Sequence, residues 1–329
     1  MRREPSGFPP HITRCRTVRL LFKCLLAVTL IGIVFPISGS LLSRQREPYT
    51  VSVDVDLVLL NVRALYRNGE VVTGLPKDNF KVYEEGRLQE LAVFIGQGAP
   101  ATIGLVVDSS ASMARKWTEV QRAVATFAEE SNPRDEMFII QFSDEIHWAL
   151  PQAKAFTTDA EEIKEATMKV SPSGRTALYD AIAGGLDHLK KGRFEKKILV
   201  ILSDGADNAS VQDFEQLLAA ARQASVTLYT IGFYEPEAED RNPKVLKRLA
   251  AVTGGEAYFP RSEEELQATW RRIADGVRTQ YTLGYYPLNP GDGTFRKVKV
   301  VVKSPGGAKL SVHTRPGYLA RMRRNDTGK

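Results

Sequence analysis

The sequence has few of the residues that most enzyme and metal sites use. It contains two cysteines and four histidines in 329 residues. Both cysteines, Cys15 and Cys24, lie within residues 1–46 at the N-terminus. The rest of the chain therefore has no disulfide, no thiolate nucleophile and no cysteine-based metal site. An exported protein of this size without disulfides depends on its hydrophobic core for stability.

The common catalytic and nucleotide-binding motifs are also missing. The histidines are scattered along the chain, and HExxH does not occur. The GxSxG turn of serine hydrolases is absent. No GxxxxGK[ST] or GxGxxG loop follows a strand candidate, which disfavours nucleotide binding. The four histidines are His11, His147, His188 and His313.

Positive charge is concentrated at the two ends of the chain. Residues 1–46 carry a net charge of +7 and residues 315–329 carry +4, within a total of +6. Residues 47–314 therefore carry −5. A mildly acidic body lacks the basic face of nucleic-acid-binding proteins, so we expect no nucleic-acid partner. Residues 321–329 are expected to form a basic, disordered tail.

Residues 1–46 have the pattern of an export signal. Basic side chains precede the apolar stretch Leu25–Ile37, and the small residues 38–40 follow it. This order of charged, apolar and small residues is typical of a signal peptide. The stretch is shorter than the roughly 20 residues of a membrane-spanning helix, although Leu41 and Leu42 extend it. An uncleaved N-terminal membrane anchor is the alternative, and either places the body in the periplasm, the cell envelope or the medium.

Residues 49–98 and 281–320 are rich in strand patterns. Apolar residues alternate with polar ones from Val51 to Leu59, which predicts a half-buried strand. Asn68-Gly69 and Glu85-Gly86 are typical hairpin turns. Each segment supplies only three or four strands, which is marginal for independent stability. We therefore expect the two segments to form one small β-sandwich, with the intervening residues inserted as a separate domain.

Residues 101–280 alternate between strand and helix patterns, which predicts a doubly wound α/β domain. Several strand candidates are apolar on both faces, as expected for a mostly parallel sheet covered by helices on both sides. The strand candidates are Ile103–Val107, Met137–Phe142, Lys197–Leu202, Thr227–Phe233 and Ala257–Phe259. The helix candidates span residues 113–130, 159–169, 177–191, 211–224, 243–252 and 262–279.

Three loops expected at the carboxyl edge of this sheet carry oxygen-bearing side chains. Asp108, Ser110 and Ser112 come at the end of the first strand, Thr176 precedes a helix, and Asp204 directly follows an apolar strand. Ligands of open α/β sheets bind at the carboxyl ends of the strands, so these side chains should converge. Carboxylates and hydroxyls suit Mg²⁺, Mn²⁺ or Ca²⁺ rather than zinc or copper. The sequence therefore predicts a divalent metal site, with Mg²⁺ as the first candidate.

Simpler roles remain open for single residues of this region. A serine after a strand often caps the next helix, and Ser112 fits that role. Asp207 and Asn208 are expected to form a turn rather than to bind metal. Asp144 and Glu145 are expected to be solvated loop residues.

The segment Asp108-Ser109-Ser110-Ala111-Ser112, taken with Thr176 and Asp204, resembles the metal-ion-dependent adhesion site of von Willebrand factor type A domains. All five ligand positions match, and Ala111 stands where many members have glycine. The resemblance implies that the serines and the threonine coordinate the metal. It also implies that the aspartates bind it directly or through water, and that a partner's Asp or Glu completes the shell.

The flanking segments resemble a bacterial group of exported proteins related to this family. The resemblance lies in "GLPKDNFKVYEEGRLQE" before the α/β region and in "YTLGYYP", "FRKVKVVVK" and "RPGYLA" after it. It extends over nearly all of residues 50–320. The resemblance implies the chemistry of the metal site but does not name the partner that binds there.

These observations favour an exported protein-binding module, not an enzyme, that coordinates a partner carboxylate through a divalent cation. A structural envelope protein with a vestigial metal site is the first alternative. A Mg²⁺-dependent phosphotransferase or hydrolase, with Asp108 as nucleophile and Asp204 on the metal, is the second. Such enzymes typically need another aspartate where this chain has Ser110, and a lysine where the second loop offers only Arg175.

Overall fold

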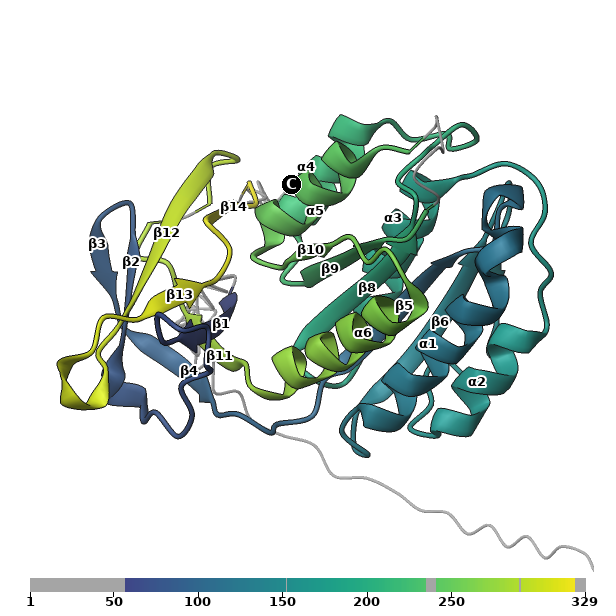
Figure 1. Ribbon diagram of the computed structural model, residues 1–329. Coiled ribbons are helices and arrows are strands. Elements are labelled where there is room, and N and C mark those ends of the chain that lie inside the picture. Colours follow the sequence, from purple (N-terminus) through teal and green to yellow (C-terminus); the bar gives the residue numbers. More distant parts are fainter. Residues whose placement is uncertain (1–56, 152, 235–240, 290, 323–329) are drawn as a thin grey trace, which may run out of the picture. The chain divides into compact units, whose positions relative to one another are not determined.

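The computed structural model describes residues 57–322 except 152, 235–240 and 290 (Figure 1). The expected signal segment with its cysteines, most of the expected strand over 49–59 and the tail at 323–329 lie outside the described residues. The described residues all belong to one compact unit. No helix within the described ranges is long and apolar enough to span a bilayer.

A six-stranded sheet with the order β10-β9-β8-β5-β6-β7 forms the centre of the α/β part (Figure 1). All neighbours are parallel except the edge strand β7, which runs antiparallel to β6. The sequence did not predict β7, because three residues at an exposed edge show no usable periodicity. The strands are β5 (Thr102–Asp108), β6 (Glu136–Phe142), β7 (Ile146–Trp148), β8 (Lys197–Ser203), β9 (Thr227–Gly232) and β10 (Ala257–Tyr258).

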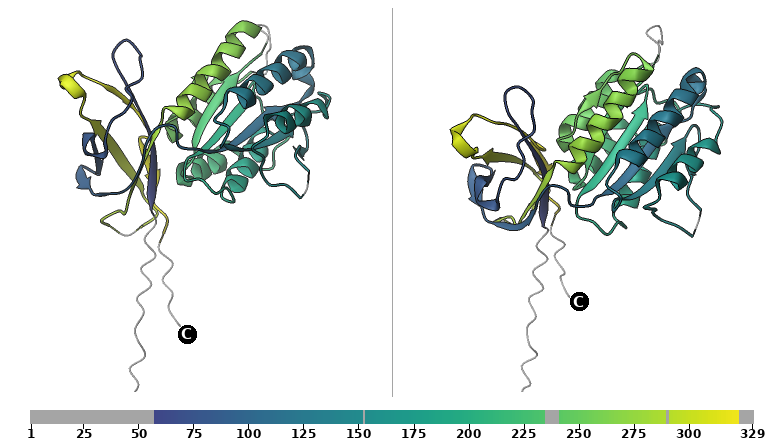
Figure 2. Two further views of the ribbon diagram at one scale, coloured as in Figure 1. Left: turned by 90° about the horizontal axis from the view of Figure 1, so that it is seen from below. Right: turned by 60° about the horizontal axis from the view of Figure 1, so that its bottom comes forward.

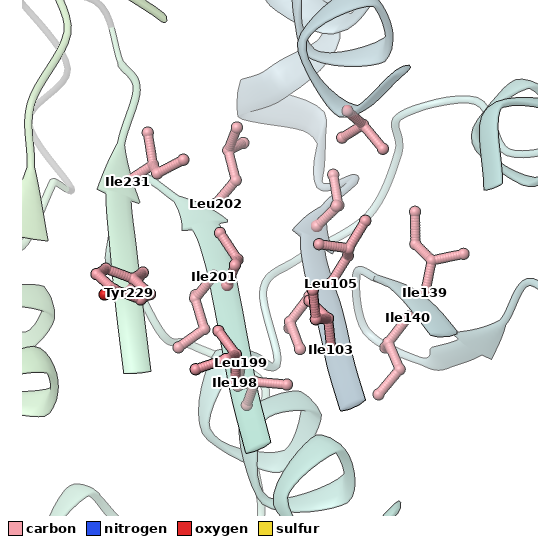
Figure 3. Close-up of a cluster of buried hydrophobic side chains, with 14 of the residues drawn as sticks. Ile103, Leu105, Ile139, Ile140, Ile198, Leu199, Ile201, Leu202, Tyr229 and Ile231 are labelled. Atoms are coloured by element: carbon pink, nitrogen blue, oxygen red, sulfur yellow. The ribbon is translucent and has the colours of Figure 1, made fainter. Parts of the chain in front are cut away.

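The inner strands of this sheet are buried on both faces, as Figure 3 shows for their isoleucine and leucine side chains. Every residue of β5 is buried. Gly104 leaves room in the middle of β5, where a Cβ atom would lie 2.4 Å from Cζ of Phe138 and 2.5 Å from Cδ1 of Leu199. A larger residue at this position would have to displace both of these side chains.

Helices cover both faces of the sheet. The helices α1, α2 and α6 pack together on one face, and α3, α4 and α5 pack together on the other (Figure 1). A 3-10 turn, η2 (Ala111–Lys116), leads from β5 into α1. The helices are α1 (Trp117–Glu130), α2 (Ala160–Met168), α3 (Leu178–Leu189), α4 (Phe214–Gln223), α5 (Pro243–Thr253) and α6 (Glu263–Arg278).

Local sequence signals set the helix ends. Asp213 and Gln216 form a reciprocal capping box at the start of α4. Asn242 caps α5, whose first residue is Pro243, and Gly254 ends that helix in the left-handed conformation. The predicted doubly wound fold class, flanked by antiparallel sheets, is confirmed.

The two ends of the described chain build two four-stranded antiparallel sheets, β13-β1-β11-β4 and β14-β12-β2-β3. Each sheet combines strands from before and after the α/β part. Two 3-10 turns, η1 (Lys77–Asn79) and η3 (Pro305–Gly307), lie between strands. The strands are β1 (Val58–Leu65), β2 (Phe80–Glu84), β3 (Arg87–Gln89), β4 (Leu91–Ile95), β11 (Tyr281–Tyr285), β12 (Phe295–Val302), β13 (Ser311–His313) and β14 (Gly317–Leu319).

Both predicted hairpin turns are present. A bridge between Leu65 and Val71 closes the turn at Asn68-Gly69. The turn between β2 and β3 places Glu85 and Gly86 at φ values of +46° and +80°. Positive φ at two successive residues gives the tight turn whose twist matches the flanking strands.

Side chains of both sheets fill one shared core, and we call the two sheets together the sandwich. A buried carboxylate ties these two sheets together. Glu84 accepts hydrogen bonds from the hydroxyls of Tyr285 (2.7 Å) and Tyr318 (2.8 Å). Arg296 lies 3.1 Å from the same carboxylate, and its guanidinium is also 3.6 Å from Asp292. Burial, reinforced by Glu84, raises the pKa of both tyrosines far above its usual value. Both phenols therefore stay protonated and act as donors.

Polar contacts join the sandwich to the α/β part. Asn61 donates to the hydroxyl of Thr227 at 3.0 Å, Arg63 pairs with Glu256, and Arg315 donates to the carbonyl of Ala224 at 3.0 Å. The division into domains at 101 and 280 remains a prediction, because the described residues all belong to one compact unit.

The side chain of Lys196 contacts both segments that connect the sandwich to the α/β part. Its ammonium donates to the carbonyls of Ala99 (3.2 Å), Val277 (3.3 Å) and Gln280 (3.2 Å). Ala99 lies on the way into the α/β part, and the other two carbonyls lie at its exit, at the end of α6. Burial lowers the pKa of Lys196 to about 8.

Replacing Glu84 with alanine is expected to lower the free energy of unfolding by about 3 kcal/mol, because it removes the main counter-charge of buried Arg296. It also leaves two buried hydroxyls without their acceptor. Urea denaturation of residues 47–329 measures the loss. The control is Glu90→Ala at an exposed glutamate beside β3, where we expect less than about 0.5 kcal/mol. Equal losses in the two variants would contradict this role of Glu84.

Candidate metal centre

The two predicted carboxylates lie on neighbouring strands at one edge of the central sheet. Asp108 is the last residue of β5, and Asp204 directly follows β8. β5 lies between β6 and β8. After β5 the chain adds β6 on one side of β5, and it later adds β8 on the other side. The direction in which strands are added to the sheet therefore reverses at β5. Such a reversal is where open α/β sheets bind ligands.

A chain of hydrogen bonds links four of the five predicted ligands. The backbone N–H of Ser110 donates to Oδ1 of Asp108 at 2.9 Å. The hydroxyl oxygens of Ser110 and Ser112 lie 3.0 Å apart, and Ser112 donates to Oδ2 of Asp204 at 3.0 Å. Asp108, Ser110 and Asp204 are buried, whereas Ser112 is exposed. The cluster is therefore closed towards the core and open at Ser112.

Thr176, the fifth predicted ligand, is held in the adjacent loop just before α3. Its backbone N–H donates to the side-chain oxygen of Asn208 at 2.9 Å. Its carbonyl accepts from the backbone N–H groups of Asn208 (2.9 Å) and Ala209 (3.1 Å). Thr176 is buried. These contacts fix the Thr176 loop to the loop that follows Asp204.

The first loop is joined to the Thr176 loop as well. The backbone N–H of Ser173 donates to the carbonyl of Ser109 at 2.9 Å, and that of Ala111 donates to the carbonyl of Gly174 at 3.2 Å. All three loops that carry predicted ligands are thus connected by direct hydrogen bonds. The structure brings the loops together, while the ligand roles of the five side chains remain a prediction.

The sequence analysis missed Ser203, the last residue of β8. Its hydroxyl donates to Oδ2 of Asp108 at 2.7 Å and accepts from the backbone N–H of Gly205 at 3.0 Å. Ser203 therefore orients the Asp108 carboxylate and the turn after Asp204 together. The signal was present in the motif Ser203-Asp204-Gly205, but only the strand pairing shows that Ser203 faces Asp108.

Two residues that we expected to be loop residues also position the Thr176 loop. Asp144 is an exposed loop residue, as predicted, and its carboxylate accepts a hydrogen bond from the backbone N–H of Arg175. Asn208 does more than form a turn, because its side chain holds Thr176. Asp207 behaves as expected, with a carboxylate that accepts from the hydroxyl of Ser210 at 2.6 Å in the same turn.

The site disfavours negative charge on Asp108. Burial raises the pKa of Asp108 to about 6, and the nearby carboxylate of Asp204 adds to this shift. Hydrogen bonds from Ser110 and Ser203 partly offset it. A divalent cation beside the two carboxylates would reverse this penalty and favour the ionised form.

The donor set fits a hard divalent cation. Two carboxylates and three hydroxyls supply only oxygen, which Mg²⁺, Mn²⁺ and Ca²⁺ prefer. Within the part of the chain that the structure describes, no three His, Cys, Asp or Glu side chains gather as a metal-binding group. A metal here would therefore depend on the serine and threonine hydroxyls. Because the protein would supply only two carboxylates, a cation here would keep coordination positions for water or for an external carboxylate.

Comparison with known families identifies the α/β part. The sequence model of the von Willebrand factor type A domain matches residues 102–271. The chain belongs to this family. The match covers the whole central sheet and most of α6, and so includes every predicted ligand. Type A domains mediate protein–protein interactions.

Two curated relatives contain a similar type A region. Human inter-alpha-trypsin inhibitor heavy chain H3 is 26% identical over 211 residues, which is 58% of this chain and 23% of that protein. The bovine protein of the same name is 27% identical over the same shares. The chain thus spans about a quarter of the length of these relatives.

The solved structures that the chain matches include two bacterial proteins. A von Willebrand factor type A protein from Catenulispora acidiphila has a TM-score of 0.48 and 15% identity, covering 83% of this chain and 76% of that one. The conserved hypothetical protein BatB from Bacteroides thetaiotaomicron has a TM-score of 0.43 and 16% identity, covering 54% and 98%.

Removing the charge of Asp108 is expected to stabilise the metal-free type A domain. The folded pKa of Asp108 lies above its ordinary 3.8, so its burial penalty is complete above pH 6 and is relieved as pH falls towards 4. In EDTA at pH 7.5, Asp108→Asn should be more stable than the parent by up to about 3 kcal/mol, and the difference should shrink towards pH 4.5. Urea unfolding across this pH range measures it. A difference that does not change with pH would contradict the buried-charge interpretation.

Proposed function

We propose that this chain is an exported, metal-dependent protein-binding module. Membership in the type A family supports a role in protein interaction. The observation that carries the metal-dependent part is the hydrogen-bonded chain from Asp108 through Ser110 and Ser112 to Asp204, placed where the winding of the sheet reverses. Thr176 completes the proposed ligand set, with Mg²⁺ as the first candidate and Mn²⁺ or Ca²⁺ as alternatives.

The chain's own residues would hold the cation and shape its open side. Asp108 and Asp204 would supply charge from the ends of neighbouring strands, and Ser203 would keep the Asp108 carboxylate in position. When bound, the cation would offer a coordination position to an Asp or Glu carboxylate of a partner protein. Exposed Ser112 marks the side from which that carboxylate would enter.

The phosphotransferase alternative needs Asp108 as an accessible nucleophile. Asp108 has an exposed fraction of 0%, and both of its carboxylate oxygens are engaged by Ser110 and Ser203. The position that would hold a second catalytic aspartate is Ser110. These features support a ligand role for Asp108 over attack on a phosphoryl group.

Export is proposed from the sequence of residues 1–46. The order of basic, apolar and small residues there supports a signal peptide, and an uncleaved anchor is the alternative. The mature chain would then work in the periplasm, the envelope or the medium.

Calorimetric titration of Mg²⁺ and Mn²⁺ into residues 47–329 tests the metal site. Saturable binding is expected in the parent and none in Asp108→Ala, because the variant loses one of only two carboxylates. Asp187→Ala, at an exposed aspartate on α3, is the matched control and should bind like the parent. Absence of binding in the parent would reject the metal-dependent mechanism and favour a structural envelope protein with a vestigial site.

The role of Asn208 gives a second test. Asn208→Ala should weaken metal affinity by about tenfold, because residues that orient ligands typically contribute 10–100-fold to affinity. Thr176→Ala removes a proposed ligand and should weaken affinity at least as much, whereas Thr176→Ser keeps the hydroxyl and should restore most of it. The same titration measures all three variants. Equal affinity in Thr176→Ala and the parent would remove Thr176 from the ligand set.

A further inference from the structure

The outer face of the sheet β14-β12-β2-β3 carries a distinct set of side chains. Residues opposite each other in antiparallel strands share a face, and Lys299 lies opposite Tyr83, which lies opposite Leu88. Val301 lies opposite Lys81 in the same way. We call the outward side chains Lys81, Tyr83, Phe295, Lys297, Lys299 and Val301 the lysine face.

The two faces of this sheet differ in burial. The inward residues Val82, Val298 and Val300 fill the sandwich core. On the outer side, Leu88, Phe295 and Val301 are 55%, 43% and 40% exposed. Large apolar side chains gathered on one exposed face are typical of a binding surface.

The opposite sheet of the sandwich does not share this feature. Its strand β1 contacts the type A domain through Asn61 and Arg63. The outward positions of β11 are also buried, as Thr282 and Gly284 show. The exposed apolar face of the sandwich is therefore that of β14-β12-β2-β3, in which β2, β3 and β12 lie side by side (Figure 2).

An open groove of about 800 Å³ lies over part of the lysine face. Tyr83, Phe295, Val301 and Pro316 line it with apolar surface. The side chains of Lys297 and Lys299 line the same groove. The lining suits a peptide segment that places apolar side chains in the groove and carboxylates beside the two lysines.

The charge on this face has one sign. The outward positions of the described strands in this sheet hold Lys81, Lys297 and Lys299 and no acidic residue. Glu85 lies at the β2–β3 turn, where its carboxylate accepts from the backbone N–H of Lys297 at 2.5 Å. Because residues 47–314 carry a net charge of −5, a face with only lysines departs from the rest of the body.

We propose that the lysine face binds an extended acidic segment of a partner protein. Its apolar side chains occupy the groove, and its carboxylates pair with the lysines. The recessed apolar surface favours a peptide over a flat anionic membrane, because a bilayer would meet the lysine ammonium groups first and leave the groove unfilled. This surface is separate from the metal site and does not depend on it.

Selection from a phage-displayed dodecapeptide library on residues 47–329 in EDTA tests the proposal. EDTA silences any metal-dependent binding, so this result is independent of the proposed function. We expect enriched peptides that combine Asp or Glu with aromatic or aliphatic residues. Fluorescence anisotropy with a synthetic enriched peptide then measures affinity for the parent, for Lys297→Glu/Lys299→Glu and for Phe295→Ala.

The charge-reversed variant should lose at least about tenfold in affinity, which is about 1.4 kcal/mol. Phe295→Ala should also weaken binding. Lys169→Glu/Lys191→Glu, which makes the same charge change at exposed lysines of the type A domain, should bind like the parent. Circular dichroism checks that each variant is folded.

Three results would overturn the proposal. They are the absence of enriched peptides, enriched peptides without acidic residues, and equal affinity in the parent and Lys297→Glu/Lys299→Glu. Binding of the parent and of the double variant to vesicles of phosphatidylglycerol and phosphatidylethanolamine is measured for comparison. Vesicle binding that the same double variant abolishes, with no peptide enriched, would assign the face to anionic lipid instead.

Discussion

The buried carboxylate of Asp108 is the constraint on which the candidate site depends. The central strand β5 carries an ionisable group to a position with no exposure to solvent, beside a second carboxylate. Such a group is costly unless donors or a cation compensate it. Ser110 and Ser203 supply donors from two different strand ends, and this requirement draws the loops after β5 and β8 together. The Thr176 loop joins them through its own backbone hydrogen bonds.

A second buried carboxylate organises the sandwich in a different way. Glu84 is satisfied entirely by partners within the chain, two tyrosine hydroxyls and the guanidinium of Arg296. Asp108 has hydroxyl and backbone donors but the nearby charge of Asp204 works against it. This contrast separates a structural carboxylate from one suited to an external cation. Both lie within one compact unit, in which Lys196 ties the two connections between sandwich and type A domain.

The two proposed surfaces use different physical principles. The metal site would obtain specificity from coordination geometry, in which a single carboxylate fills an open position. The lysine face would act through apolar contact and through charge that salt screens. A module with both could engage one partner at two points or two partners at once. The strands that form the lysine face come from before and after the type A domain in the sequence. The type A domain therefore does not interrupt this face.

The fold class, the two hairpin turns and the strand ends that carry Asp108 and Asp204 could be predicted from the sequence alone. These features depend on local periodicity, turn residues and the rule that ligands lie at the carboxyl ends of parallel strands. The tertiary structure decided what local pattern cannot encode. It showed that Ser203 faces Asp108 and that Asn208 and Asp144 hold the Thr176 loop. It also showed that Lys297 and Lys299 share a face with Tyr83, because strand register pairs residues more than 200 positions apart.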